Sequence, residues 1–325
     1  MASIGKHVLM MNNKRTVPLL GLGTWQSSPG EVKQATKVAL ECGYRHIDTA
    51  QAYGNEAEIG DAIQEFLQAT KTPRDELFIT TKLAMPFMGA DTVKPACQNS
   101  LKKLKLDVID LFLIHTPLGM KYMGLDKPWA IGPDGKVQFE AHDLVACWKA
   151  MEKLVDEGLV RSIGVSNFNS EQITRILKNC RIKPVTNQVE CHAYFPQEEL
   201  SSFLKEKDML LTAYAPFASP GRPKAIRKPD EGTPLLEHPV IADLAKKYKK
   251  TPAQILLRNL IQRGMVVIPK STNPTRIQQN AQVFDFELSE TDQTAIAGLK
   301  NGKRLFDGSS YGANTHPENP FVVPF

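Results

Sequence analysis

Four residues of the chain carry side chains that together could move a proton. Asp48 and Tyr53 lie five residues apart in the stretch HIDTAQAYGNEAEIG. Lys82 ends the run LFITTK, and His115 ends the run LFLIH. A phenol has a pKa of ~10 and is a poor acid near neutral pH. A nearby ammonium group lowers that pKa because it favours the phenolate, and a carboxylate can hold the ammonium group in place.

This chemistry suits proton transfer to an oxygen atom that gains negative charge. Asp48 would orient Lys82, and Lys82 would lower the pKa of Tyr53. Tyr53 would then serve as a general acid toward a developing alkoxide, a form of catalysis that contributes typically ~10²–10⁴-fold. His115 would hydrogen-bond and orient the carbonyl oxygen from which the alkoxide forms. The residue types therefore predict a site that reduces a carbonyl group.

Each residue also has an ordinary structural explanation. A lone Lys or His at a strand end is most often a solvated boundary residue, and a lone Tyr is most often half-buried packing. The catalytic interpretation depends on all four residues meeting at one rim. The five cysteines are irregularly spaced and include no C-x-x-C pair, so we expect no metal site.

The elements that would position these residues alternate along the chain. Apolar, β-branched runs are followed by stretches with a helical period of 3.6 residues. Eight runs are expected to form strands: Leu19–Thr24, His46–Ala50, Leu77–Lys82, Val108–His115, Val160–Ser166, Thr186–His192, Leu210–Ala215 and Met265–Lys270. Eight such units over about 250 residues predict an α/β fold of the (β/α)₈ TIM-barrel type. In that fold the C-terminal ends of the strands meet at one mouth, which would bring the four residues together.

The competing fold is a doubly wound open sheet, which would need a G-x-G-x-x-G fingerprint after its first strand. The stretch GLGTWQ has Gly21 and Gly23, but Gln26 stands where the third glycine is needed, so the barrel is favoured. Ahead of the barrel, VLMMNNKRTVPLL predicts a β-hairpin that turns near Asn12 and Asn13. We expect residues 1–325 to form a single domain.

Three connections are too long for plain strand-to-helix loops and are expected on the C-terminal face of the barrel: Thr116–Phe139, Phe217–Leu236 and the tail from Lys300. Long loops in a compact domain are usually functional or mobile. The second contains four basic residues: Arg222, Lys224, Arg227 and Lys228. It could be a solvated surface excursion or a lid over a phosphorylated ligand, and the sequence leaves both open.

The stretch VVIPKSTNPTRIQQN predicts a phosphate site after the last strand. Asn273 can cap a helix and Pro274 suits its first position. A helix N-terminus binds phosphate through its free N–H groups and its dipole. Lys270, Ser271 and Arg276 add two cations and a hydroxyl, as expected for a 2′-phosphorylated dinucleotide. The same cations could instead belong to a solvated helix start.

Other residues at predicted strand ends could hold the rest of such a cofactor. Tyr214 could stack on a flat nicotinamide ring. Ser166, Asn167 and Gln188 could hydrogen-bond the carboxamide group of that ring.

Composition and charge limit the kinds of partner that we expect. The net charge of +5 is mild, and no motif supports a nucleic-acid surface. The N-terminal stretch lacks the apolar run of a signal peptide, and no stretch approaches the ~18 apolar residues of a membrane span. An odd number of scattered cysteines indicates a reducing compartment. We therefore expect a cytoplasmic protein that acts on a small molecule, without nucleic-acid or membrane partners.

The chain resembles the aldo-keto reductase family over essentially its whole length. GYRHIDTAQAYGNEAEIGDAI, VRSIGVSNF and VVIPKSTNPTRIQQN resemble the three family signatures in order. The resemblance implies a barrel whose bottom is plugged by a β-hairpin, with NADPH bound in extended form without a Rossmann domain. The nearest branches are the aldehyde and aldose reductases, which are usually monomeric.

The resemblance also assigns residues. The catalytic residues would be Tyr53, Asp48, Lys82 and His115. The cofactor-binding residues would be Thr24, Trp25, Asp48, Ser166, Asn167, Gln188, Tyr214, Phe217, Ser219, Lys270, Ser271, Arg276, Gln279 and Asn280.

The chain departs from the family pattern at four of its positions. Ala84 follows TKL and Thr116 follows LIH, where many relatives have Trp. Ala215 stands where Ser is common after the stacking Tyr, and Gln279 replaces a frequent Glu.

Ala84, Thr116 and Trp129 are expected to line the substrate pocket. Without the two indoles the pocket would be wide and would favour bulky aromatic or polycyclic carbonyls. Alternatively Phe87, Trp129 or the tail segment YGANTHPENPFVVPF could fill the space.

The expected function is NADPH-dependent reduction of aldehydes and ketones to alcohols. One alternative is a dehydrogenase of the same family that acts on hydroxysteroids or similar lipids. Another is a non-catalytic, NADPH-binding barrel with a regulatory or structural role. The intact set of Asp48, Lys82 and Tyr53 argues against the last alternative, because binding alone has no need of a proton relay.

Overall fold

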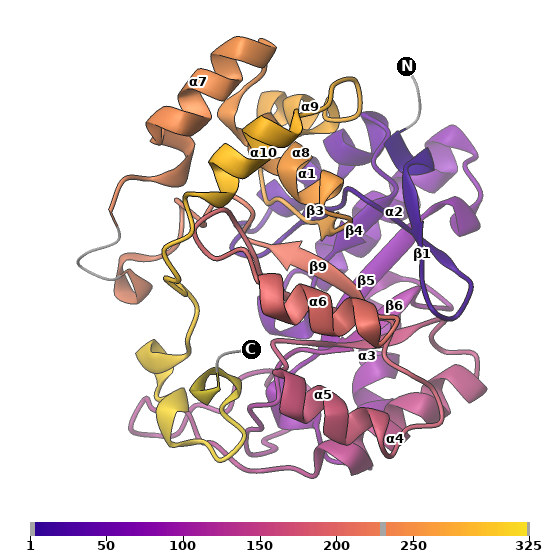
Figure 1. Cartoon of the computed structure of the whole chain (residues 1–325). Coiled ribbons are helices and arrows are strands. Elements are labelled where there is room, and N and C mark those ends of the chain that lie inside the picture. Colours follow the sequence, from indigo (N-terminus) through magenta and orange to yellow (C-terminus); the bar gives the residue numbers. More distant parts are fainter. Residues whose placement is uncertain (1–3, 228–231, 324–325) are drawn as a thin grey trace.

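A computed structural model describes residues 4–227 and 232–323, and its core is a closed barrel of parallel strands (Figure 1). Each strand pairs with the strand that follows it in the chain: β3 Leu22–Gly23, β4 His46–Asp48, β5 Phe78–Leu83, β6 Leu111–Ile114, β7 Ile163–Ser166, β8 Thr186–Glu190, β9 Leu210–Tyr214 and β10 Val266–Val267. The two ends of this sheet also meet. The Val267 N–H donates to the Leu19 carbonyl over 2.8 Å, and the Gly21 N–H donates to the Val267 carbonyl over 2.9 Å. The predicted (β/α)₈ barrel is confirmed.

The regular strands at this seam are shorter than the predicted runs. β3 and β10 have two residues each, although the flanking backbone still bonds across the seam, as the Gly23 N–H does with the Pro269 carbonyl at 3.0 Å. A Cβ atom at Gly23 would lie 2.6 Å from the Ile268 carbonyl oxygen. Glycine is therefore required where the first and last strands approach most closely.

Helices follow the strands and surround the barrel: α1 Glu31–Glu41, α2 Glu56–Thr70, α3 Val93–Leu104, α4 Leu144–Asp156, α5 Ser170–Leu177, α6 Glu198–Glu206, α7 Pro239–Tyr248, α8 Pro252–Gln262, α9 Pro274–Ala281 and α10 Glu290–Ala297. Their apolar faces have helical spacing. In α1 the buried side chains include Val32, Ala35 and Ala39, and Gly43 follows the helix end at a φ of 97°. The helical period was predicted from the sequence, and Gly43 adopts the left-handed conformation common just after a helix end.

The N-terminal hairpin, β1 Val8–Met10 and β2 Thr16–Pro18, covers the end of the barrel where the strands begin. The Asn12 amide donates to the Pro184 and Asp208 carbonyls, each over 2.9 Å, just ahead of β8 and β9. The Asn13 amide donates to Ser162 Oγ over 2.8 Å, just ahead of β7. The predicted turn is confirmed, and the hairpin leaves the opposite end of the barrel for chemistry.

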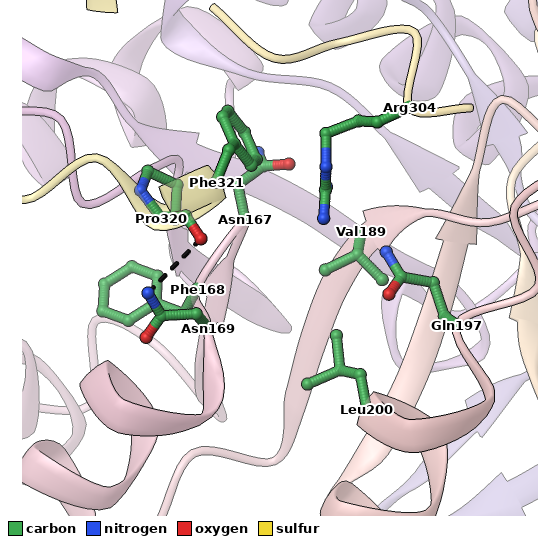
Figure 2. Close-up of a pocket in the computed structure, with 9 residues that line it drawn as sticks. All are labelled: Asn167, Phe168, Asn169, Val189, Gln197, Leu200, Arg304, Pro320 and Phe321. Atoms are coloured by element: carbon green, nitrogen blue, oxygen red, sulfur yellow. Dashed lines mark hydrogen bonds between the residues drawn. The ribbon is translucent and has the colours of Figure 1, made fainter. Parts of the chain in front are cut away.

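The C-terminal tail, residues 300–323, returns from α10 to the opposite side of the barrel and lies beside α5 (Figure 1). The Asn169 amide donates to the Pro320 carbonyl over 3.3 Å (Figure 2), and Glu318 pairs with Arg175 at 2.6 Å. The segment 116–139 meets the tail where the Trp129 and Tyr311 rings lie edge to face, 6.1 Å apart. The tail therefore joins elements that lie far apart in the sequence.

The segment 217–236 is described except for residues 228–231, which include Lys228. The Arg222 guanidinium is buried and donates to the Ala218 and Ser219 carbonyls at 2.9 and 3.0 Å. Arg222 therefore holds the start of its own segment. Within the described ranges, no helix is both long enough and apolar enough to span a membrane.

Candidate active site

Asp48 and Lys82 form a fully buried ion pair inside the barrel. Lys82 Nζ lies 2.6 Å from Asp48 Oδ1, and the two side chains are 0% and 2% exposed. The same ammonium group donates to the Thr49 carbonyl at 2.8 Å and to Tyr53 Oη at 3.4 Å. β4 and β5 are adjacent parallel strands, so their C-terminal ends place the carboxylate and the ammonium group side by side.

Tyr53 stands on a short turn that a buried glutamine holds in place. Tyr53 ends the 3₁₀ turn Gln51–Tyr53, and Gly54 follows at a φ of 70°. The Gln51 amide donates to Ser100 Oγ at 2.9 Å, and its carbonyl oxygen accepts the Ala84 N–H at 2.8 Å. These contacts fix the phenol above Lys82.

The pKa of Tyr53 is raised well above 10, mainly by burial and further by the Asp48 carboxylate. The expected lowering of this pKa by Lys82 is therefore not found. Lys82 lies 0.8 Å closer to Asp48 than to the phenol, so its charge is largely balanced by the carboxylate. Burial also lowers the pKa of Lys82, and Asp48 offsets part of that shift. Tyr53 is thus a protonated phenol at neutral pH, which is the form that can donate a proton.

His115 completes the group. Its ring lies edge to face with Tyr53, with the ring centroids 5.5 Å apart. Burial, aided by the Lys82 charge, lowers the pKa of His115 to about 3, so the imidazole is neutral. Its Nδ1 atom is buried and has no hydrogen-bond partner. All four residues predicted to meet at one rim do so in the structure.

A hydrogen-bonded chain connects this group to the predicted nicotinamide residues. The Gln188 amide donates to Asp48 Oδ2 over 2.7 Å, and Ser166 Oγ donates to the Gln188 carbonyl over 2.8 Å. The Asn167 amide donates to the His115 carbonyl over 3.0 Å. The Tyr214 hydroxyl donates to Asn167 Oδ1 over 2.8 Å. Asn167 has a φ of 59°, a conformation that asparagine tolerates better than most residues.

The other residues predicted near the ring lie around the same mouth. Thr24 is buried, and its hydroxyl donates to the Asp48 carbonyl at 2.9 Å. Trp25 and Tyr214 both contact the ring of Phe306, at centroid distances of 5.5 and 5.7 Å. Ser219 has a positive φ of 43° and Phe217 is half-buried beside it.

The predicted phosphate residues surround the N-terminus of α9. Asn273 caps this helix, and its side chain accepts the Arg276 N–H at 3.0 Å. Lys270 and Arg276 are exposed, and in the described part of the chain neither forms an ion pair. The pKa of Lys270 is lowered by partial burial and further by the Arg276 charge, while Glu31 opposes the shift. An anion between the two cations would relieve their repulsion, so these residues fit a phosphate group.

The remaining residues assigned to the cofactor lie in and beside α9. Ser271 and Asn280 are buried, at 8% and 4% exposure. Gln279 is half-buried, and its carbonyl accepts the Gln254 amide at 2.9 Å.

The three residues predicted to line the substrate pocket differ in exposure. Ala84 is 0% exposed and Thr116 is 8% exposed, whereas Trp129 is 38% exposed. Phe87, at 1% exposure, packs in the same apolar cluster as Ala84. Ala84 therefore presents no surface at the mouth. The Trp129 indole N–H donates to the Ala52 carbonyl over 3.2 Å, beside the turn that carries Tyr53.

Sequence reasoning missed two residues that meet at the mouth. Phe306 contacts both Trp25 and Tyr214, and Glu190 at the end of β8 binds the tail beside it. No local pattern marks this contact, because the tail has no periodic face and its partners lie far away in the sequence.

Comparison with known proteins agrees with this geometry. A profile of the aldo/keto reductase family matches residues 19–301. Aldo-keto reductase family 1 member A1-A of Danio rerio is 45% identical over 98% of this chain and 99% of its own. Aldo-keto reductase family 1 member C3 of Homo sapiens is 44% identical over 96% of each chain. The structure of the aldose reductase from Schistosoma japonicum has a TM-score of 0.90 and 42% identity, covering 98% of this chain and 99% of that one. This chain belongs to the aldo/keto reductase family of oxidoreductases.

Proposed function

We propose that this protein uses NADPH to reduce aldehydes and ketones to alcohols, with Tyr53 as the general acid. The observation that carries the proposal is the set of contacts that runs from the buried Asp48–Lys82 ion pair to the half-buried Tyr53, beside the neutral ring of His115. A purely binding or structural barrel gains nothing from this arrangement, because a buried ion pair contributes little to stability on average.

Each residue has one role in the proton transfer. The Tyr53 hydroxyl donates its proton to the carbonyl oxygen of the substrate. Lys82 stabilises the phenolate that remains, and Asp48 holds the ammonium group in place. His115 is neutral, so one ring nitrogen can donate a hydrogen bond that orients the carbonyl group. When bound, NADPH would supply the hydride.

The choice of NADPH rests on the cations near α9. Lys270 and Arg276 would bind the 2′-phosphate, with Ser271 and the free N–H groups of the helix N-terminus. Tyr214 would support the nicotinamide ring. Asn167, Ser166 and Gln188 already form a connected polar chain beside it, and would orient its carboxamide.

The test is loss of the NADPH absorbance band when the purified protein meets a panel of aldehydes, ketones and steroids. Turnover of aromatic or aliphatic carbonyls is the expected result. Efficient reaction with steroids alone would favour the hydroxysteroid alternative. Tight NADPH binding without turnover of any carbonyl would defeat the proposal and favour a binding role.

A further inference from the structure

One buried carboxylate holds the C-terminal tail against the barrel. Glu190 is the last residue of β8 and is 0% exposed. Its Oε1 accepts the Leu305 N–H at 2.8 Å, and its Oε2 accepts the Phe306 N–H at 2.9 Å. Both carboxylate oxygens therefore accept hydrogen bonds from the tail backbone, and these bonds do not depend on the side chains at positions 305 and 306.

A neutral histidine supports this carboxylate. His192 is also 0% exposed, and its Nε2 lies 2.9 Å from Glu190 Oε1. Its Nδ1 accepts the Phe195 N–H at 3.2 Å, so the ring proton is on Nε2 and points to Glu190. Three N–H donors thus converge on one buried charge, which offsets the cost of removing it from water.

Arg304, the tail residue just before Leu305, packs against two aromatic rings. The Arg304 guanidinium lies over the rings of Phe195 and Phe321, at 4.6 and 4.5 Å from their centroids. Arg304 and Phe321 both line a cavity of about 10 Å³, which has room for about one water molecule (Figure 2). The tail is therefore well packed from Arg304 to Phe306.

The pairing of β8 with β9 places the contact between Glu190 and the tail beside the mouth of the barrel. Glu190 pairs with Tyr214 across β8 and β9, so the carboxylate lies beside the residue that is proposed to support the nicotinamide ring. The Phe306 ring, fixed by its own N–H bond to Glu190, lies edge to face with both Tyr214 and Trp25.

We propose that Glu190 is a positioning residue, which fixes Phe306 as a wall of the substrate site by holding the tail backbone. The proposal rests on the proposed function, because it takes the mouth between Tyr53 and Tyr214 as the place where the cofactor and the carbonyl bind. Loss of this contact with the tail would let Phe306 move away, so bulky carbonyls that depend on this wall would bind more weakly.

The direct test is hydrogen–deuterium exchange in the full-length Glu190→Gln variant. A glutamine amide keeps one acceptor oxygen but turns an N–H group toward a backbone donor, so one of the two bonds is lost. Exchange at the amides of Leu305 and Phe306 should accelerate by about tenfold or more. Glu318→Gln is the matched control, because this tail carboxylate binds the side chains of Arg175 and Gln172 and should leave both amides unchanged.

The kinetic test asks whether Glu190 affects substrate binding through Phe306 or only holds the tail in place. In Glu190→Gln the KM for a bulky aromatic aldehyde should rise about tenfold, with kcat and the NADPH Kd within about threefold of the original values. Phe306→Ala should give the same KM change. The double variant Glu190→Gln, Phe306→Ala should show no larger a KM change than either single variant, because both act through the same ring.

Two results would overturn the proposal. Unchanged exchange at Leu305 and Phe306 in Glu190→Gln would show that the carboxylate does not hold the tail. Faster exchange with an unchanged KM would make Glu190 a structural anchor only. If Glu190→Gln does not fold, Leu305→Pro removes one donor and leaves the carboxylate intact, and the same outcomes apply. Absence of any carbonyl turnover by the unaltered protein would defeat the proposed function, while the exchange comparison would still decide whether Glu190 holds the tail.

Discussion

Tyr53 keeps its proton because the phenolate would be buried close to the Asp48 carboxylate. When that anion forms, it is stabilised by Lys82, whose ammonium group is 3.4 Å from the phenol oxygen. The two residues should therefore matter for the chemical step more than for binding.

We expect Tyr53→Phe to lower kcat by about 10²–10⁴-fold, since the hydroxyl is the proposed proton donor. The Kd for NADPH, measured by fluorescence, should stay within about twofold, because the ring remains. Tyr122→Phe is the control, as this tyrosine is 45% exposed and outside the site. Retention of more than about a tenth of the original kcat would reject Tyr53 as the acid.

Two histidines, His46 and His115, should make stability depend on pH. The pKa of His46 is lowered to about 4 and that of His115 to about 3, in both cases chiefly by burial. Below pH 6.5 the unfolded chain binds protons that the folded chain excludes. The free energy of unfolding should then fall as pH drops toward 4, by about 1.4 kcal/mol per pH unit for each such proton.

Urea unfolding at pH 7 and pH 5 measures this slope. His46→Gln should reduce it, whereas His7→Gln, at an exposed position, should not. An equal slope in all three proteins would show that His46 does not titrate differently in the two states.

The sequence revealed the four rim residues for a physical reason. Parallel strands end at one face, so a polar residue at each predicted end could be assigned to a common mouth. The raised pKa of Tyr53 could not be predicted in the same way. Its sign depends on how deeply the phenol is buried and on the difference of 0.8 Å between the distances from Lys82 to Asp48 and to Tyr53.

At the scale of elements, the proposed preference for NADPH rests on the cations at the N-terminus of α9. Arg276→Ala should remove a charge-assisted bond worth about 1.5–3 kcal/mol, and so raise the KM for NADPH by roughly 10–150-fold. The KM for NADH should change little, since it has no 2′-phosphate. Arg181→Ala, a surface pair with Asp156, is the control. Equal losses with both cofactors would contradict this assignment.

The hairpin should contribute stability without affecting chemistry. Asn12→Ala removes two bonds to the carbonyls ahead of β8 and β9, and should lower the free energy of unfolding by about 1–3 kcal/mol. Asn13→Ala removes one bond and should cost less. A fall in kcat, at full folding, would show that the hairpin end is coupled to the mouth.

Element faces were predictable where periodicity is strong, as in α1, and element ends were not. Strand ends at the barrel seam depend on the approach of Gly23 to Ile268, residues from opposite ends of the fold. No window of local sequence contains that contact.

At the scale of the whole molecule, segments from distant parts of the chain meet at the mouth, whereas Ala84 is packed in the core together with Phe87, three residues further along the chain. An indole there would have to displace the buried Phe87. We expect Ala84→Trp to lower the free energy of unfolding by about 1–3 kcal/mol or more, as overpacked cores do. Ala297→Trp, on the exposed face of α10, should be nearly neutral. Unchanged stability of Ala84→Trp, together with a smaller substrate range, would show that the position opens into the pocket.

This packing could not be predicted from the positions of the missing indoles alone. Phe87 follows β5, whereas Thr116 and Trp129 both lie in the connection after β6, and only the folded chain shows how much of each side chain is exposed. Trp129 reaches the turn that carries Tyr53, while Ala84 is covered.

The seam between β3 and β10 also has a consequence during synthesis. The Leu19 carbonyl accepts its hydrogen bond from the Val267 N–H, which is synthesised about 250 residues later. The barrel therefore cannot close until almost the whole chain has left the ribosome. At about 5–20 residues per second, the open edge of the first strand persists for roughly 10–50 s. The nascent chain therefore carries an unpaired strand edge through most of its translation, and β3, with only two regular residues, offers little template for pairing with a neighbouring chain.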